Sequence, residues 1–505
     1  MARLSAVCVF VYVVNVGLRI SLAVTFPLLY KEASFWEWSQ FPQTGYLRHP
    51  PLVTWIIHFF TWAFSDDSRT VLRLGSVILG AVSFLQIRSL AARLFGDPDV
   101  ANWSLLIAIS LPVVSCVGIV MLPDAPLLFF HLLFLNLFVT ALQQGSQKSW
   151  LLAGVALGLA LLSKLMAVLT VPAIVLFLLW SPTYRHWLRR KEPYGALAVA
   201  LFVFSPFLYW NYTNEWATFR FQLWSRHEPS FAFSKLLEVA FEQLLDSTPF
   251  MLIPVLGVLC ISSSRLPAKW REGYVLLKIQ SLSVLIFFLA AGSVTETHPH
   301  WTLLAYPSAA IALAAFYVSC PSHFLNRPLR ILTTTSLSVL TLLACVVIVS
   351  IGSLKDLDPA RLGPSFGKRV AKAQQTLFGW QELGPALNRR LEESFDNETS
   401  LLFTDTDYTG IVAYHSGSQP VVNLHGLTDG EESTNNSQRY YIDLRTLVGR
   451  SGIFFSEKQR PTEQILREWF EEIEELEPIQ FRYQERVIVY YRVFRVANFK
   501  SSQNR

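Results

Sequence analysis

The sequence contains little charge and little cysteine, and both shortages exclude familiar classes of protein. Charged residues make up 16% of the 505 residues, whereas a soluble domain usually carries about 25%, so the chain is not a single soluble globule. The five cysteines include no CxxC pair and none lies after position 345. The chain therefore shows no disulfide framework and no zinc-binding motif.

The charges that are present are unevenly distributed. Residues 1–354 contain 38 charged side chains, about 11% of that segment, whereas residues 355–505 contain 41, about 27%. We therefore predict a membrane domain over 1–354 and a soluble domain over 355–505. The soluble segment has 19 Lys and Arg against 22 Asp and Glu and no G-x-G-x-x-G motif, so it is a poor candidate for binding nucleic acid.

Long apolar runs divide the first segment into membrane spans of about 20 residues. The block 149–181 is too long for one upright helix and is predicted to form two helices that meet at Lys164. The N-terminal run is too long for the core of a signal peptide and is interpreted as a retained first span. The two helices of the block 149–181 and nine single spans give eleven membrane spans in total. The single spans are predicted at 6–28, 69–93, 101–122, 125–143, 194–212, 246–264, 273–292, 301–319 and 331–354.

Lysine and arginine gather at alternate span ends, which predicts a cytoplasmic face there. The first loop (29–68), Asp124, Lys164 and the segment 355–505 then lie on the outer face. The first loop is predicted to contain short surface helices over 32–40 and 50–64, the second in the membrane interface. The soluble segment has a mixed α/β pattern, with helices over 380–395 and 462–476 and strands over 400–404, 411–415, 452–456 and 485–496.

Polar residues on the predicted outer face are candidates for chemistry. The first loop places Glu32, Glu37 and His49 beside tryptophan and tyrosine, a mixture that suits either carbohydrate binding or an aromatic belt at the interface. Asp124 lies in a short turn between spans and is either a functional group at membrane depth or a solvated turn residue. Lys164 can pair with a phosphate as a point charge or extend to the interface without a ligand.

A histidine pair and a mid-depth arginine complete the candidates. His298 and His300 could ligate a metal, although their motif supplies no third ligand. Together with the carboxylates and Lys164 they describe a cavity suited to a lipid-phosphate-linked sugar. Arg19 lies within the first span, and a charge at that depth keeps a transporter open as an alternative.

The chain resembles the bacterial polyprenyl-phosphate-sugar glycosyltransferases of GT-C fold, the relatives of lipid A aminoarabinose transferase and of the protein O-mannosyltransferases. The resemblance follows an ordered set of motifs at Lys31–Gln40, Gly45–Leu52, Leu122–Phe130, Gly158–Val168, Ser205–Arg226, Pro299–Ala309, Phe378–Trp380 and Arg482–Phe499.

This resemblance implies a polytopic α-helical membrane protein of about 11–13 transmembrane helices in the bacterial inner membrane, with a periplasmic C-terminal α/β domain. It also implies inverting transfer of a sugar from a polyprenyl-phosphate donor to a lipid, glycan or protein acceptor, with no cofactor required and a divalent metal as an option. Glu32 and Asp124 would be catalytic, and Lys164 would hold the donor phosphate. The further predicted binding residues are Tyr46, Arg48, His49, Asn211, Arg226, His300 and Glu37.

The chain departs from the family where Lys31 and Arg48 replace two aspartates. Three interpretations follow: Glu32 or Glu37 is the base, the substrate is anionic, or the protein is an inactive relative. A membrane carrier of lipid-linked saccharide is the alternative to an enzyme. Residues five apart on a helix point about 140° apart, so we predict that Glu32 faces the cavity and that Glu37 faces the interface or pairs with Lys31 or Arg48.

Overall fold

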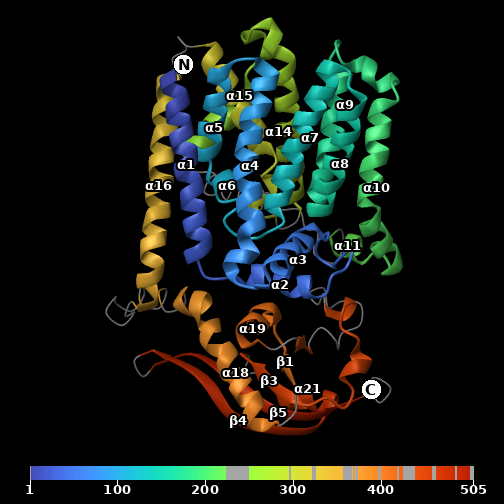
Figure 1. Ribbon diagram of the computed structural model, residues 1–505, viewed down its shortest axis with the longest axis vertical. Helices are drawn as coiled ribbons and strands as arrows, with labels where there is room; N and C mark the ends of the chain where they lie inside the picture. Colours follow the sequence, from blue (N-terminus) through green and yellow to red (C-terminus); the bar gives the residue numbers. More distant parts are fainter. Residues whose placement is uncertain are drawn as a thin grey trace. The chain divides into compact units, whose positions relative to one another are not determined.

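The chain forms two compact units. One consists of Met1–Val24 with His49–Val347, and the other of Thr25–Arg48 with Ile348–Arg505 (Figure 1). Part of the first loop therefore groups with the C-terminal residues, whereas the charge distribution assigned the whole loop to the membrane domain. The computed structural model describes residues 2–222, 249–294, 297–320, 326–356, 367, 370, 373–395, 400–417, 420–424, 438–457, 462–483 and 486–500.

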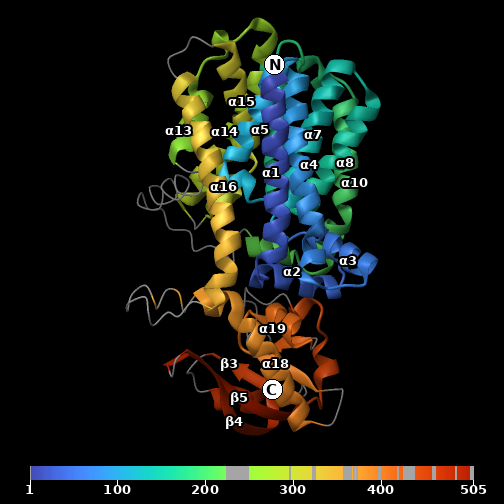
Figure 2. The same cartoon turned by 60° about the vertical axis from the view of Figure 1, so that its left-hand side comes forward.

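The first unit is a bundle of apolar helices, and each predicted span contains at least one of them. Among the described residues, six helices are long and apolar enough to cross a membrane, and several shorter apolar helices accompany them. Figure 2 shows α13 and α14 beside α15. The helices are α1 (Ala2–Thr25), α3 (Leu52–Phe64), α4 (Arg69–Phe95), α5 (Pro98–Ser110), α6 (Pro112–Ser115), α7 (Asp124–Gln144), α8 (Gln147–Ser163), α9 (Thr170–Trp180), α10 (Glu192–Thr213), α11 (Ala217–Arg220), α13 (Pro249–Cys260), α14 (Arg271–Gly292), α15 (Ala305–Ser319) and α16 (Asn326–Asp356).

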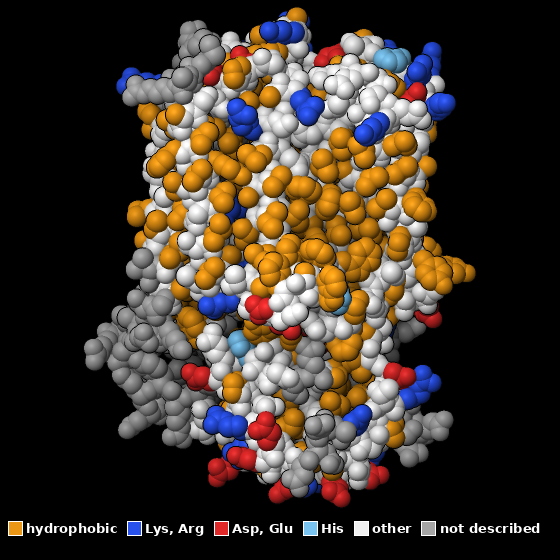
Figure 3. Space-filling model, in the orientation of Figure 1, with side chains coloured by type: hydrophobic (Ala, Val, Ile, Leu, Met, Phe, Trp, Pro, Cys, Tyr) orange, Lys and Arg blue, Asp and Glu red, His pale blue; other side chains and the backbone are white. Residues whose placement is uncertain are grey.

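The surface of these helices is apolar. Large side chains such as Phe10, Leu179 and Phe202 are exposed, and on the face shown in Figure 3 hydrophobic side chains form a continuous band, with Lys and Arg gathered at one end. Lipid is the solvent that suits such a band, because exposed apolar side chains are unfavourable in water and a helix bonds most of its backbone groups internally. The unit is a multi-pass membrane domain.

Two predictions about the spans have different outcomes. The two helices predicted to meet at Lys164 are confirmed: α8 ends at Ser163, Lys164 is extended, and the 3-10 helix η1 (Leu165–Leu169) follows. The single span predicted over 101–122 is wrong, because α5 ends at Ser110. Pro112 lacks the N–H that a continuing helix needs and disfavours a helical conformation at the residue before it.

The second unit contains helix α2 (Tyr30–Gln40), helices from the C-terminal segment and a five-stranded sheet of order β2-β1-β3-β5-β4. The strands β2, β1 and β3 are parallel, whereas β5 pairs antiparallel with β3 and β4. Phe403, Phe454, Trp469 and Phe494 fill the core. The remaining elements are α18 (Trp380–Ser394), β1 (Leu401–Thr404), α19 (Thr409–Ser416), β2 (Val421–Asn423), β3 (Gly452–Ser456), α21 (Thr462–Trp469), β4 (Phe470–Tyr483) and β5 (Arg486–Phe499).

The predicted helix over 380–395 and the strands at 400–404, 452–456 and 485–496 are found, but two assignments are wrong. The predicted strand 411–415 belongs to helix α19, because a short apolar run does not distinguish a strand from a buried helix. The predicted helix 462–476 ends at Trp469 and continues as β4. Pairing with β5 decides the second case, since Glu474 lies directly opposite Arg495 and Glu475 bonds Arg492 at 2.8 Å.

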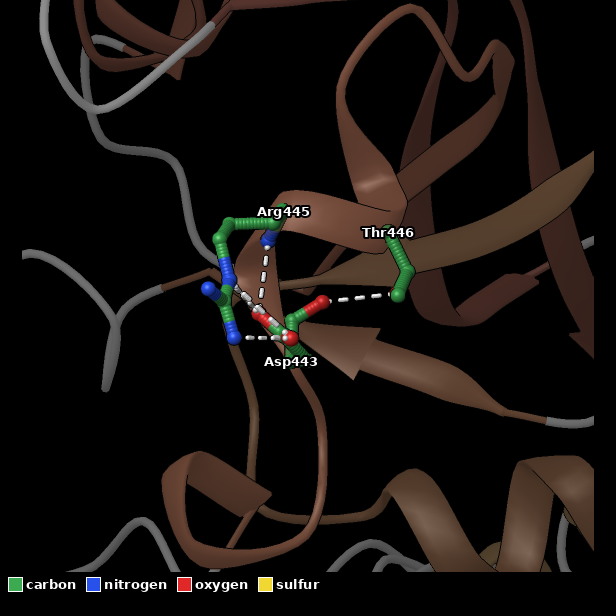
Figure 4. A network of polar contacts seen from close by, with 3 residues as sticks. All are labelled: Asp443, Arg445 and Thr446. Carbon is green, nitrogen blue, oxygen red and sulfur yellow. Dashed lines mark hydrogen bonds and ion pairs between the residues drawn. The ribbon is translucent and has the colours of Figure 1, made fainter.

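A surface turn in this unit shows how the chain returns to the sheet. The carboxylate of Asp443 accepts hydrogen bonds from the backbone N–H of Arg445 at 3.0 Å and from its guanidinium at 2.8 Å. The hydroxyl of Thr446 donates to the carbonyl of Asp443 at 2.6 Å (Figure 4). Asp443 is thus the N-cap of the 3-10 helix η10 (Leu444–Leu447), which precedes β3.

Candidate functional site

An ion pair between two predicted site residues lies in the membrane unit. The ammonium Nζ of Lys164 lies 2.9 Å from Oδ1 of Asp124, and the side chains are only 11% and 14% exposed. A charge pair this close and this shielded is much stronger than an ordinary surface pair. The structure therefore brings together the predicted phosphate-binding cation and one of the two predicted catalytic carboxylates.

The local backbone explains how the two side chains meet. Asp124 is the first residue of α7, where the positive end of the helix dipole favours a carboxylate. Lys164 lies between α8 and η1 with φ −160° and ψ 133°, so its side chain leaves the helical path of both. Each charged residue therefore occupies a helix terminus at which the apolar run is interrupted.

Two histidines add to the electrostatics of this pair. His300 and His49 contribute to the electrostatic environment of the Asp124 carboxylate, beside its ion pair with Lys164. His49 directly precedes the segment that begins α3, and His300 lies in the 3-10 helix η6 (Pro299–Thr302), where its ring stacks on His298 with centroids 5.6 Å apart. Four predicted residues thus form one group, which we call the Asp124 cluster: Asp124, Lys164, His49 and His300.

The first-loop carboxylates lie in the second unit, on helix α2. Glu32 is fully buried, and its Oε2 accepts a hydrogen bond from the backbone N–H of Leu29 at 3.2 Å. This is the reciprocal bond of a capping box at the helix start. Gly410 of α19 permits a close approach to α2, because a Cβ at that position would lie 2.5 Å from the carbonyl oxygen of Ala33.

Glu37 is buried against the C-terminal residues of the same unit. Its Oε2 accepts from the hydroxyl of Thr409 at 2.8 Å and its Oε1 from Nε2 of Gln438 at 2.7 Å. The prediction that Glu37 faces the interface or pairs with Lys31 or Arg48 is wrong, because two neutral donors of the folded tail satisfy its carboxylate. Burial raises the pKa of Glu37 from the usual 4.5 to about 7, against the opposing effect of these hydrogen bonds.

The raised pKa of Glu37 makes the stability of the second unit pH-dependent. Its folded pKa exceeds its unfolded pKa, so the stabilising contribution of the protonated form is fully present below about pH 4.5 and is lost as the pH rises through about 7. The loss is on the order of 3 kcal/mol. We expect thermal unfolding of the full chain in detergent to show this fall between pH 4.5 and 7.5 and Glu37→Gln to flatten it. The exposed Glu382 gives the matched control Glu382→Gln, and an equal slope in wild type and Glu37→Gln would contradict the assignment.

The other two first-loop candidates also make contacts inside the second unit. The Tyr46 hydroxyl lies 2.9 Å from the carbonyl oxygen of Trp38, and the two rings stack with centroids 5.1 Å apart. Arg48 forms an ion pair with Asp407 at 3.7 Å. Both residues thus help to hold the first loop in its folded form.

The predicted site residues that follow α9 have different placements. Asn211 is buried near the end of α10, where its amide donates to the carbonyl of Phe207 at 3.1 Å and accepts from the N–H of Thr218 at 3.1 Å. The amide therefore organises the turn between α10 and α11. Arg226 lies outside the described residues.

The structure adds residues that the sequence did not indicate. Thr409 and Gln438 are 372 and 401 positions from Glu37, and no local motif connects them. In the part of the chain that the structure describes, no group of three or more His, Cys, Asp or Glu is arranged to hold a metal ion.

Comparison with known proteins agrees with the predicted resemblance to polyprenyl-phosphate-sugar glycosyltransferases. Residues 48–210 match the family model described as dolichyl-phosphate-mannose-protein mannosyltransferase. The lipid A galacturonosyltransferase of Rhizobium johnstonii is 31% identical over 189 residues, which cover 37% of this chain and 39% of the relative. The undecaprenyl phosphate-alpha-4-amino-4-deoxy-L-arabinose arabinosyl transferase of Pseudomonas aeruginosa is 29% identical over 249 residues, covering 47% and 43%. The chain thus spans about two fifths of the length of these curated relatives.

A solved structure extends the fold comparison to the whole chain. The crystal structure of ArnT from Cupriavidus metallidurans bound to undecaprenyl phosphate superposes with a TM-score of 0.61 at 15% identity, covering 98% of this chain and 97% of that one. The fold is that of a polytopic membrane protein with a small C-terminal sheet domain. The predicted resemblance is confirmed: the chain is related to the glycosyltransferases of GT-C fold.

Proposed function

We propose that the protein is an inverting glycosyltransferase that moves a sugar from a polyprenyl-phosphate donor to a periplasmic acceptor. The ion pair of the Asp124 cluster carries this proposal, because it places a shielded ammonium beside a carboxylate at the ends of apolar helices, with His49 and His300 in its electrostatic environment. The named relatives, which act on lipid A or use undecaprenyl phosphate, support the donor class. Lipid A or another envelope glycan is the acceptor class that we favour over protein.

The chemistry of the proposed step follows from these groups. An acceptor hydroxyl oxygen attacks the anomeric carbon, the bond from that carbon to the phosphate oxygen breaks, and the electron pair leaves with the phosphate. Lys164 stabilises the developing charge on the leaving oxygen. A carboxylate accepts the proton of the attacking hydroxyl, and the candidates for this base are Glu32 and Asp124.

Donor cleavage is the decisive measurement. We expect purified protein in detergent, supplied with a panel of polyprenyl-phosphate sugars and a lipid A acceptor, to release free polyprenyl phosphate only when the acceptor is present. Movement of intact donor between the leaflets of a liposome without cleavage would instead show a carrier. Binding of donor without either activity would show an inactive relative.

The proposed location is the bacterial inner membrane, with the C-terminal unit in the periplasm. Lys and Arg at one end of the helical bundle support this orientation. We expect activity from a reporter that works only in the periplasm when it is fused after Arg505. Activity of a reporter that works only in the cytoplasm, fused at the same position, would contradict the proposal.

A further inference from the structure

The buried arginine of the first span donates hydrogen bonds to three protein acceptors. Arg19 is 1% exposed, its Nε donates to Oδ1 of Asn15 at 2.8 Å, and its Nη2 donates to the carbonyl of Ser115 at 2.7 Å. Its Nη1 donates to the carbonyl of Val117, and its guanidinium lies 4.8 Å from the ring centroid of Phe84. A charge at this depth is costly unless such partners compensate it.

The carbonyls that Arg19 binds lie at the start of an irregular segment between two helices. Residues 116–123 connect α6 to α7 through turns and an isolated bridge between Val117 and Val120. Backbone groups at membrane depth must find partners inside the protein. Arg19 supplies donors at the start of this segment, and the hydroxyl of Ser76 on α4 supplies one to the carbonyl of Val120 at 2.7 Å.

Two glycines bring α4 and this segment into direct contact. A Cβ on Gly80 would lie 2.8 Å from Cα of Gly118 and 3.0 Å from Nη1 of Arg19. Gly118 also has φ +93°, a conformation that residues with a side chain rarely adopt. The contact leaves the segment little room to shift, so its position is fixed by side chains of α1 and α4.

The segment ends at Pro123, and the next residue is Asp124. We infer that Arg19 and Ser76 are positioning residues for the Asp124 cluster: they fix the backbone that delivers Asp124 to Lys164. The inference deepens the proposed function and rests on it for its effect on turnover. It also assigns a structural role to Arg19, the charge that favoured a transporter as the alternative, since a guanidinium that is 1% exposed and bonded to Asn15, Ser115 and Val117 is shielded from a passing solute.

The first measurement does not depend on activity. Lysine cannot reach the three acceptors of Arg19 at once, so Arg19→Lys should speed hydrogen–deuterium exchange of peptides covering 116–122 about tenfold or more. Ser76→Ala should speed this exchange less, because it removes only one hydroxyl group and its single hydrogen bond. The matched control is Arg88→Lys, because Arg88 Nε likewise donates to an asparagine, Asn102, at 3.1 Å, but this bond joins α4 to α5 and not to residues 116–123. Unchanged exchange in both Arg19→Lys and Ser76→Ala would overturn the inference.

The second measurement tests whether the effect passes through Asp124. A displacement of about 1 Å in a reacting group can cost about 10²-fold in rate, so Arg19→Lys and Ser76→Ala should lower kcat by roughly 10- to 100-fold. In an Asp124→Asn background the same substitutions should cause no further fall in the residual turnover. Equal falls in both backgrounds would overturn the positioning role. Absence of turnover in wild type with every donor would refute the proposed function, while the exchange experiment would still decide the role of Arg19.

Discussion

Glu32→Gln is expected to lower turnover by about 10²- to 10⁴-fold, the usual cost of losing a general base, while donor affinity survives. Glutamine keeps an amide oxygen in place of Oε2, so it can still accept the hydrogen bond from the N–H of Leu29 that caps α2. The substitution therefore removes the candidate proton acceptor and preserves the helix start. Turnover with a polyprenyl-phosphate sugar and the Kd for the donor are the two quantities to measure.

The same helix provides the matched control. Glu37→Gln changes a second buried carboxylate of α2, one that is bonded to Thr409 and Gln438, and it should lower turnover much less than Glu32→Gln when both are measured below pH 6. If Glu32→Gln retains near-normal turnover and Asp124→Asn has none, the catalytic carboxylate is Asp124. Loss of donor binding in Glu32→Gln would point instead to a structural role for the capped helix start.

The sequence predicts most of the membrane unit because apolar run length is a local property. The break at Lys164 follows from a block too long for one helix, and the structure has it at that residue. The prediction of one span over 101–122 is wrong because hydropathy carries no information about hydrogen bonding. The run stays apolar past Pro112, and a buried arginine from another helix provides hydrogen-bond donors for the non-helical backbone.

The candidate site is predictable only where its residues carry their own signal. Asp124 and Lys164 stand out because a charge beside an apolar run is unusual, and the structure pairs them. The environment of Glu37 could not be predicted, because its partners come from a segment about 400 positions away and are neutral residues with no distinctive pattern. Helical geometry predicts that Glu32 and Glu37 point in different directions, but it could not show what each side of the helix would meet.

Lys164→Ala is expected to weaken donor binding by roughly 1.5–3 kcal/mol, the contribution of a hydrogen bond to a charged group, which is a rise of about 10- to 150-fold in Kd. The ammonium lies 2.9 Å from the Asp124 carboxylate and the Lys164 side chain is only 11% exposed, so the substitution removes a charge that water screens little. Asp124→Asn should not weaken donor binding, because it frees the same ammonium from its competing anion. The measurement is titration of the detergent-solubilised protein with undecaprenyl phosphate, which carries the leaving group without the sugar.

Lys148 offers the control for this experiment because it lies on α8, the helix that ends directly before Lys164. It is exposed near the start of α8, so Lys148→Ala removes one positive charge from the protein without touching the Asp124 cluster and should leave Kd unchanged. A lower affinity in both variants would show that net charge, rather than a specific contact, attracts the phosphate. Unchanged affinity in Lys164→Ala would remove Lys164 from the donor site, and His49 and His300 would then be the residues of the cluster left to test.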